Sequence, residues 1–505
     1  MSPTSPREPV NPGPAVGELA PVAVPAADAG VAHAAGPQAL RGSVLVGGGY
    51  AVTIALSLIA APLLIRHLGI AGFGRYTTVV AIVAVAGGMT DAGLVNIALR
   101  EWSTRSGADR QRLMRSLLGI RLELSVAGVA AGALFALVAG YDNTLVLGTV
   151  IAGVGMMLQT VANVLTVSLQ GELRFGWVTI VDIARQAVSV ALIVVLVIAG
   201  AGLLPFLAVT IPAGLVTLIF TGVLVRGDMP LWPALRGAQW WPLVRDMLPY
   251  SAAIALNALY FRVTIIVMSL IATAQQTGYF ATSFKVIEVL IGVPGLAIGA
   301  AFPILARAAT DDRDRFAYAC ERIIELAQLI GGAVVLAVVL SAPFVIDVLA
   351  GAKGAPATPV LQIQALALLA TFLAVATSYP LLALRRHVAL LIANSIALVM
   401  NIALTLVLVP LDQARGAAVA AVVAETCVCG AQLVLLLRLR VGRPRLTSLP
   451  LVVVAGLAGA TPLLISGLHP LIRMVIGLAI YAAILVAVGR TPPELRHLFE
   501  RRGQH

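Results

Sequence analysis

Several charged residues lie inside long apolar stretches of the sequence, where an ionised group is expensive to bury. Arg262 lies near the middle of such a stretch, and no acidic residue stands three or four positions away from it. Lys285 and Glu288 are three apart, so on a helix they share one face and can neutralise each other. Asp91 and Glu425 have no basic neighbour one helical turn away. Ionisable residues inside membrane helices usually mark a substrate or ion pathway, so these five residues are candidates for a functional site.

Each candidate also has a structural interpretation. Arg262 lines a water-filled cavity in one interpretation and forms a salt bridge to another helix, with Asp91 or Glu425 as partner, in the other. The same two interpretations stay open for Asp91 and Glu425, and a structural or a functional role stays open for the Lys285–Glu288 pair. Asp182 and Arg185, three apart near the end of an apolar run, favour a structural pair.

The composition requires these residues to be positioned by membrane helices. Of 505 residues, 60% are hydrophobic and 11% are charged, whereas a soluble domain has roughly 45–50% and about 25%. This excludes an ordinary soluble enzyme, a disordered chain and a disulfide scaffold. The net charge is +11 with only two lysines, and the arginines fall in short loops, so they indicate membrane topology rather than nucleic-acid binding.

No motif in the sequence indicates a reaction. A P-loop, an HExxH zinc motif and a GxSxG nucleophile motif are all missing, and the three cysteines offer no disulfide framework. We therefore expect no cofactor, no metal site, no catalytic residue and no enzymatic activity.

Fourteen apolar runs are long enough to cross a membrane as helices. With both termini inside, the inner segments hold 25 of the 34 basic residues, the outer segments hold 5 and the spans hold 4, as the positive-inside rule requires. The runs cover residues 43–65, 77–98, 117–139, 145–169, 178–200, 203–225, 248–271, 279–306, 323–342, 361–384, 388–409, 416–437, 449–467 and 470–489.

The predicted fold is therefore an all-α polytopic membrane protein with about fourteen transmembrane helices. We expect two six-helix lobes, an inter-lobe linker on the cytoplasmic side, two extra helices and a tail at each end. The predicted boundaries are 1–41 for a disordered cytoplasmic tail, 42–225 for the first lobe, 226–247 for the linker, 248–437 for the second lobe, 449–489 for the extra helices and 490–505 for a cytoplasmic tail.

An internal repeat supports the two lobes. Gly74 and Tyr76 align with Gly278 and Phe280, and the two copies are about 204–207 residues apart, a distance that six spans would fill. An even number of spans keeps both copies in the same orientation, so the repeat is parallel, with its axis along the membrane normal.

Two runs in this repeat contain residues that weaken a helix. Gly87 and Gly88 lie in the 77–98 run, and Pro294 and Gly295 lie at the matching place in the 279–306 run. Proline removes a backbone hydrogen bond and glycine lowers the energy of bending. These four residues are candidate hinges, and static kinks are the alternative.

The same stretches resemble one family of membrane proteins. PLLIRHLG, GFGRYTTV and TDAGLVNIALREW between residues 42 and 102 are similar to the opening helices of polysaccharide-biosynthesis flippases, and the order of later motifs agrees as far as residue 437. The family belongs to the multidrug/oligosaccharidyl-lipid/polysaccharide exporter (MOP) superfamily. The resemblance implies two six-helix lobes around a central cavity, and we add Arg66, in the first motif, to the candidate cavity residues. Many members have an aspartate directly after the arginine of the seventh helix, but Val263 follows Arg262 here, so that residue's role is not carried over.

The resemblance implies a flippase that moves an undecaprenyl-linked oligosaccharide from the cytoplasmic to the outer leaflet of the bacterial inner membrane. A lipid II flippase, a teichoic-acid exporter and a drug/cation antiporter are the alternatives, and a membrane polymerase or ligase is less favoured. The expected partners are the anionic lipid-linked glycan, membrane lipid, a coupling ion (H⁺ or Na⁺) and glycan-assembly proteins, with no nucleic acid.

Overall fold

The computed structural model describes residues 32–91, 93–234, 240–299, 302–439, 448–465 and 467–488, and within these residues it is helical and has no β-strand. The prediction of an all-α polytopic fold is confirmed. The α-helices are α1 (Ala32–Asp91), α2 (Leu94–Thr104), α3 (Gly107–Val138), α4 (Asn143–Gly171), α5 (Phe175–Ile198), α6 (Leu203–Ala208), α7 (Thr210–Leu224), α8 (Trp240–Ile271), α9 (Ala274–Gly299), α10 (Phe302–Asp311), α11 (Arg313–Ala350), α12 (Ala357–Ala383), α13 (His387–Arg438), α14 (Ser448–Gly459) and α15 (Pro470–Ala487).

Two long helices each carry two of the predicted spans. α1 is interrupted at Gly69, whose φ of 68° lies in the left-handed region that glycine adopts without strain. α13 is interrupted at Asp412 and Gln413, where Gln413 has a φ of 48°. Among the described residues, nine helices are long and apolar enough to cross a membrane, and these include both kinked helices. Ten of the fourteen predicted runs fall on one helix or on one half of a kinked helix, and the runs 77–98, 203–225, 279–306 and 449–467 are each divided between two consecutive helices.

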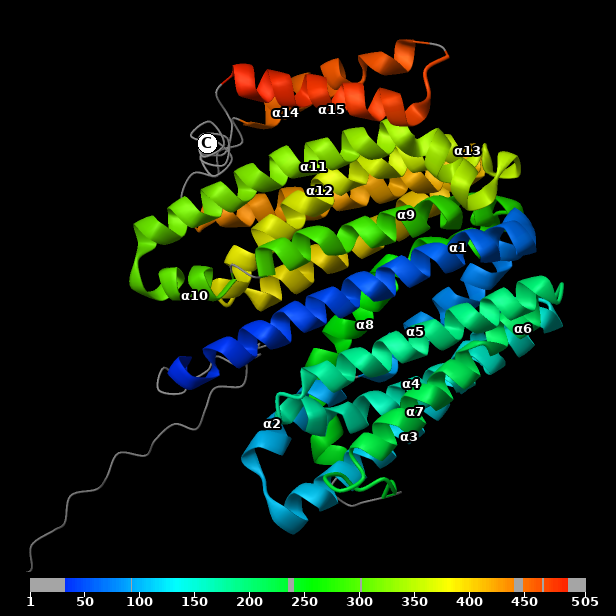
Figure 1. Cartoon of the computed structure of the whole chain (residues 1–505), viewed down its shortest axis with the longest axis vertical. Coiled ribbons are helices and arrows are strands. Elements are labelled where there is room, and N and C mark those ends of the chain that lie inside the picture. The colour runs from blue at the N-terminus through cyan, green and yellow to red at the C-terminus, as the bar shows by residue number, and fades with distance from the viewer. Residues whose placement is uncertain are drawn as a thin grey trace, which may run out of the picture.

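The helices form two groups with α1 and α8 between them (Figure 1). We call α2–α7 the first helix group and α9–α13 the second helix group. α1 packs on α3, α4 and α5 of the first group and also on α8 and α9, while α8 packs on α13. α1 therefore connects the two groups along most of its length.

The two groups share one hydrophobic core at one end of the bundle. This core includes Ile65 and Phe73 from α1, Phe206 from α6, and Met268 and Phe280 from α8 and α9, all nearly inaccessible to solvent. It lies next to the turns at 139–142 and 272–273, which follow the third and seventh predicted spans and therefore face outside when the N-terminus is inside. At the opposite end each group has a core of its own, around Trp102 in the first and around Phe372 in the second. Burial of apolar surface thus fastens the two groups together mainly at the predicted outer end.

The structure corrects two predicted boundaries. α1 begins at Ala32, inside the segment 1–41 that is predicted to be disordered. α8 begins at Trp240, inside the predicted linker 226–247. Residues 1–31 and the predicted tail 490–505 lie outside the described part of the chain.

The last two helices form a layer on the outer face of the second group. α14 and α15 pack on each other and on α11, and they lie on the far side of α11 from α1 (Figure 1). The Tyr481 hydroxyl donates a hydrogen bond to the Leu329 carbonyl oxygen at 2.9 Å. Glycines at 459 and 477 allow α14 and α15 to approach closely, since a Cβ on Gly459 would lie 2.9 Å from the Gly477 carbonyl oxygen.

Candidate functional site

A cavity of about 280 Å³ lies between the two helix groups. Side chains from α1 and from α4 to α9 line it, and four of them are charged. Arg185 comes from α5, Arg262 from α8, and Lys285 and Glu288 from α9. Three cations face one carboxylate, so the described wall of the cavity has a positive net charge.

Glu288 is held by two of these cations. Its Oε1 accepts a hydrogen bond from Arg262 Nη2 at 2.6 Å, and its Oε2 accepts one from Lys285 Nζ at 2.9 Å. The three side chains are 26–33% exposed, so they stand in a partly hydrated cavity rather than in a dry core. Hydration lowers the energy of keeping three charges at this depth, which hydrocarbon alone would not allow.

Arg262 therefore combines its two interpretations, because it lines the cavity and also pairs between helices. The partners expected for the salt bridge, Asp91 and Glu425, are wrong, since Glu288 occupies that position. The sequence could not indicate this pair, because Arg262 and Glu288 are 26 residues apart on different helices.

Arg185 faces the same cavity from the first helix group. Its Nε lies 4.0 Å from Asp182 Oδ1, too far for a hydrogen bond, and this buried nitrogen has no hydrogen-bond partner within the described residues. The pair expected from the sequence spacing is thus weak, and the guanidinium is available to the cavity.

Asp91 lies away from the cavity and pairs with Arg121. Arg121 is only 1% exposed; its Nη1 donates to the Thr90 carbonyl oxygen at 2.7 Å, and its Nη2 lies 3.1 Å from Asp91 Oδ1. A cation at the last carbonyl groups of α1 also opposes the negative end of the helix dipole. The structure places Asp91 in a contact that fixes the end of α1.

Glu425 lies in a second, smaller pocket of about 50 Å³ within the second half of the chain. Its carboxylate accepts hydrogen bonds from the Tyr260 hydroxyl at 2.8 Å and from the Thr371 hydroxyl at 3.1 Å. Gln364 lines the same pocket, is 1% exposed, and its amide nitrogen and oxygen have no hydrogen-bond partner within the described residues. Asn401, also in the wall, donates to the Thr264 hydroxyl at 3.1 Å.

The uncharged polar residues of both pockets are not among the candidates predicted from the sequence. Gln364, Thr371 and Asn401 are polar residues within apolar spans, and this feature of the sequence could have identified them as candidate site residues. A search confined to charged residues passes over them, although an unpaired buried amide is as unusual in a membrane helix as a charge.

Arg66 is placed outside the cavity wall. Its Nη2 donates to the Asp347 carbonyl oxygen at 2.8 Å, so it connects α1 to α11 near the predicted outer end. Tyr141 and Ser269 share a hydrogen bond of 2.6 Å between the α3–α4 turn and α8, and Arg75 pairs with Asp142 beside them. These polar contacts surround the end at which the two groups share a core.

The two glycines aligned by the repeat meet at the same end. A Cβ on Gly74 would lie 2.8 Å from the backbone nitrogen of Gly278 and would overlap the Ala274 carbonyl oxygen. A Cβ on Gly278 would overlap the Ile70 carbonyl oxygen. α1 and α9 thus touch backbone to backbone at corresponding positions of the two copies, as expected near the axis of a parallel repeat.

The candidate hinges lie inside continuous helices. α1 runs through Gly87 and Gly88 as far as Asp91, and α9 runs through Pro294 and Gly295 as far as Gly299. The first pair also lies at a close helix contact, since a Cβ on Gly87 would lie 2.6 Å from the Met156 sulfur. In both copies the helix ends three to five residues later, before the short helices α2 and α10. The role of the four residues as hinges stays a prediction.

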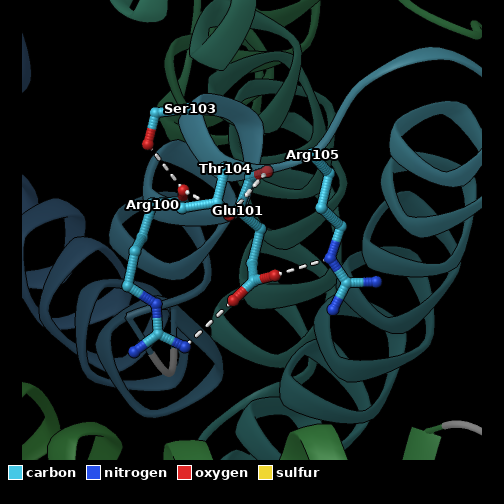
Figure 2. Close-up of polar contacts among 5 residues, drawn as sticks. All are labelled: Arg100, Glu101, Ser103, Thr104 and Arg105. Carbon is cyan, nitrogen blue, oxygen red and sulfur yellow. Dashed lines mark hydrogen bonds and ion pairs between the residues drawn. The ribbon is translucent and has the colours of Figure 1, made fainter.

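A second carboxylate shared by two cations lies away from the cavity, on α2 (Figure 2). Glu101 accepts hydrogen bonds from Arg100 Nη2 at 3.0 Å and from Arg105 Nε at 2.8 Å. Burial alone would raise the pKa of the Glu101 carboxyl, but the hydrogen bonds and charges of the two arginines outweigh it, so the pKa lies below its ordinary value. This cluster repeats the arrangement of Glu288 at a site without a cavity.

Acidification is expected to remove the stabilisation that Glu101 provides. A carboxyl whose pKa is lowered on folding stabilises the protein above its unfolded pKa, and the effect is lost as the pH falls through the folded pKa. Glu101→Gln should therefore lower the melting temperature of the purified protein near neutral pH, and should lower it much less at an acidic pH below the lowered pKa of Glu101. The effect stays below about 1 kcal/mol because both arginines are largely exposed. An equal difference at both pH values would contradict this prediction.

Solved structures with this fold are membrane transporters. The lipid II flippase MurJ in an inward closed conformation aligns with a TM-score of 0.73 at 14% sequence identity, covering 88% of this chain and 99% of that one. An inward-facing multidrug resistance MATE transporter of the MOP superfamily aligns with a TM-score of 0.66 at 16% identity, covering 77% and 94%. A MOP superfamily transporter from Pyrococcus furiosus, described as having a binding pocket of reversed polarity, aligns at 0.55 and 18%, covering 80% and 95%.

The chain thus has the polytopic all-α fold of these transporters. No curated protein matches the chain in sequence. The family model of the polysaccharide biosynthesis proteins matches residues 39–309, more than half of the chain, and the chain belongs to this family.

Proposed function

We propose that this protein is a flippase that carries an anionic lipid-linked oligosaccharide from the cytoplasmic to the outer leaflet of the bacterial inner membrane by alternating access. The observation that carries the proposal is the cavity between the two helix groups, with three cations and one carboxylate in its described wall. A hydrated, positive cavity lowers the energy of moving a phosphate-linked glycan across the hydrocarbon, while the lipid tail stays in the bilayer. The two termini lie on the cytoplasmic side in this proposal, as the arginine distribution favours.

The polarity of the cavity distinguishes this proposal from drug/cation antiport. A cavity for cationic drugs would favour acidic residues, because like charges repel the ligand. Lipid II and teichoic-acid precursors carry the same anionic phosphate as other lipid-linked glycans, so they remain within the proposed substrate class.

Reconstitution into vesicles tests the proposal directly. The probe is undecaprenyl diphosphate bearing a fluorescent disaccharide, and its movement between leaflets is followed by quenching with dithionite outside the vesicle. We expect the purified protein to move this lipid and not to transport ethidium, a cationic drug. Transport of ethidium without movement of the lipid would refute the proposal in favour of antiport.

We further propose that the Glu425 pocket binds the coupling ion, H⁺ or Na⁺. Its volume suits one small ion or water, and carboxylate, hydroxyl and amide oxygens are hard donors. The unpaired Gln364 amide supports the proposal because such a group lacks the hydrogen bonds that buried polar atoms normally make.

Glu425→Gln should uncouple transport from the ion gradient. In vesicles with an imposed Na⁺ or H⁺ gradient, the unaltered protein should respond to one of the two, and the variant should flip the lipid at the same rate with or without either gradient. A variant that keeps its full response to the gradient would exclude Glu425 from coupling.

A further inference from the structure

The arrangement around Glu288 has a property that a simple cationic binding site lacks. The Glu288 carboxylate is already paired with two of the cations of the cavity, and each of its two oxygens accepts a hydrogen bond. Arg262 comes from α8, whereas Lys285 lies on α9 with Glu288. The contact of Glu288 with Lys285 is therefore local to one helix, while its contact with Arg262 depends on how two helices stand relative to each other.

We infer that Glu288 is a resident counter-anion, which holds Arg262 while the cavity is empty and is displaced from it by the phosphate of the substrate. The inference rests on the proposed function and assigns Glu288 the role of a positioning residue that sets affinity and release. No proton or covalent bond is exchanged. Arg262 changes partner, and Glu288 keeps Lys285.

The chemistry of the groups makes this exchange reversible. Glu288 contacts Arg262 through Nη2 alone, so a phosphate that binds the guanidinium through its fork of N–H donors competes with the carboxylate for that nitrogen. Lys285 prevents Glu288 from becoming an unpaired charge when Arg262 leaves, and the partial exposure of all three side chains allows them to move. The Arg185 guanidinium, whose Nε makes no hydrogen bond within the described residues and lies 4.0 Å from Asp182, is a further cation for the same phosphate from the first helix group.

A competing anion weakens binding and speeds release, which a transporter requires as much as binding itself. Without the negative charge at position 288, the cavity would hold three uncompensated cations within its described wall, and the phosphate would leave more slowly. Affinity differences between variants of one site lie mostly in the dissociation rate. Glu288→Gln should thus increase affinity and lower maximal transport, a combination that a merely structural role does not produce.

Binding of undecaprenyl diphosphate to the full chain in lipid nanodiscs tests the inference, with undecaprenol as the uncharged reference. We expect Glu288→Gln to bind the diphosphate at least about fivefold more tightly, because a charge at contact distance contributes about 1 kcal/mol even in bulk water, and 1.4 kcal/mol is a factor of ten. The same variant should move the fluorescent lipid more slowly at saturation. Glu101→Gln is the matched control, since Glu101 is also shared by two cations but does not line the cavity, and it should leave the affinity unchanged.

A second comparison keeps the test decisive if Glu288→Gln does not fold. Lys285→Gln and the double variant Lys285→Gln/Glu288→Gln both lack the lysine and differ only in the carboxylate, and the double variant should bind more tightly. Equal or weaker binding in folded variants without the carboxylate overturns the inference alone, provided that the unaltered protein prefers the diphosphate to undecaprenol. If the unaltered protein and the variants show no such preference, both the inference and the proposed function fail.

Discussion

Arg262→Ala is expected to abolish most lipid binding and transport while leaving the protein folded. The change removes the cation that the seventh predicted span brings to the cavity, and a hydrogen bond to a charged group contributes about 1.5–3 kcal/mol, or about 10–150-fold in affinity. Folding should survive because Glu288 keeps its local partner Lys285 and stands in a partly hydrated cavity. The measurements are the affinity for undecaprenyl diphosphate, the rate of lipid movement in vesicles and the yield of folded protein.

The variant Arg262→Lys distinguishes the contribution of the positive charge from that of the planar guanidinium. Arg262→Lys should retain part of the activity, because a hydrated cavity uses the positive charge even without the planar fork. The rival explanation is a purely structural ion pair between Arg262 and Glu288. In that case Arg262→Ala would lose folded protein, and removing Glu288 as well would restore both folding and transport. Full transport by a stable Arg262→Ala protein would contradict both roles.

Gly278→Val is expected to stop transport by holding the predicted outer end open. The added side chain would overlap the Ile70 carbonyl oxygen, and a backbone atom cannot yield as a flexible side chain can. Overpacking typically raises the energy by about 1–3 kcal/mol, and each 1.4 kcal/mol lowers the population of the closed form tenfold. The protein should still fold, because this contact joins α1 to α9 rather than joining neighbours within one group.

Labelling of a cysteine in the cavity measures this change. In a background without the three native cysteines, Ser57→Cys lines the cavity and should react faster with an impermeant maleimide from outside when Gly278→Val is present. Gly430→Val is the control, since a Cβ at Gly430 meets no atom within 4 Å. Unchanged labelling together with full transport would show that close approach at Gly278 is not needed.

Much of the fold follows from local properties of the sequence. The length of each apolar run and the arginines between runs are properties of short segments, so fourteen spans could be counted without knowing how they pack. Helix boundaries are harder to predict. α1, for example, begins at Ala32, ahead of the first apolar run. The kinks at Gly69 and Gln413 were not needed to count spans, but they explain how two long helices supply four of them.

The site was predictable in its charged residues but not in their partners. Arg262, Lys285 and Glu288 stood out because charges are rare in apolar runs, and the structure brings all three to one cavity. Asp91 stood out for the same reason, yet it pairs with Arg121, a residue 30 positions away that only packing brings near. Depth within a span indicates that a charge needs a partner, whereas the choice of partner is decided by helix–helix contacts.

The core shared by the two groups also determines how the free energy of opening the predicted outer end depends on temperature. Alternating access, as proposed, must separate residues such as Ile65, Phe73 and Met268, which are buried at the predicted outer end. Where water enters, exposure of apolar surface raises the heat capacity, and the hydrophobic attraction that resists separation weakens on cooling. The free energy of opening is then a curved function of temperature, and the transport cycle has no single activation energy that holds from cold to warm conditions.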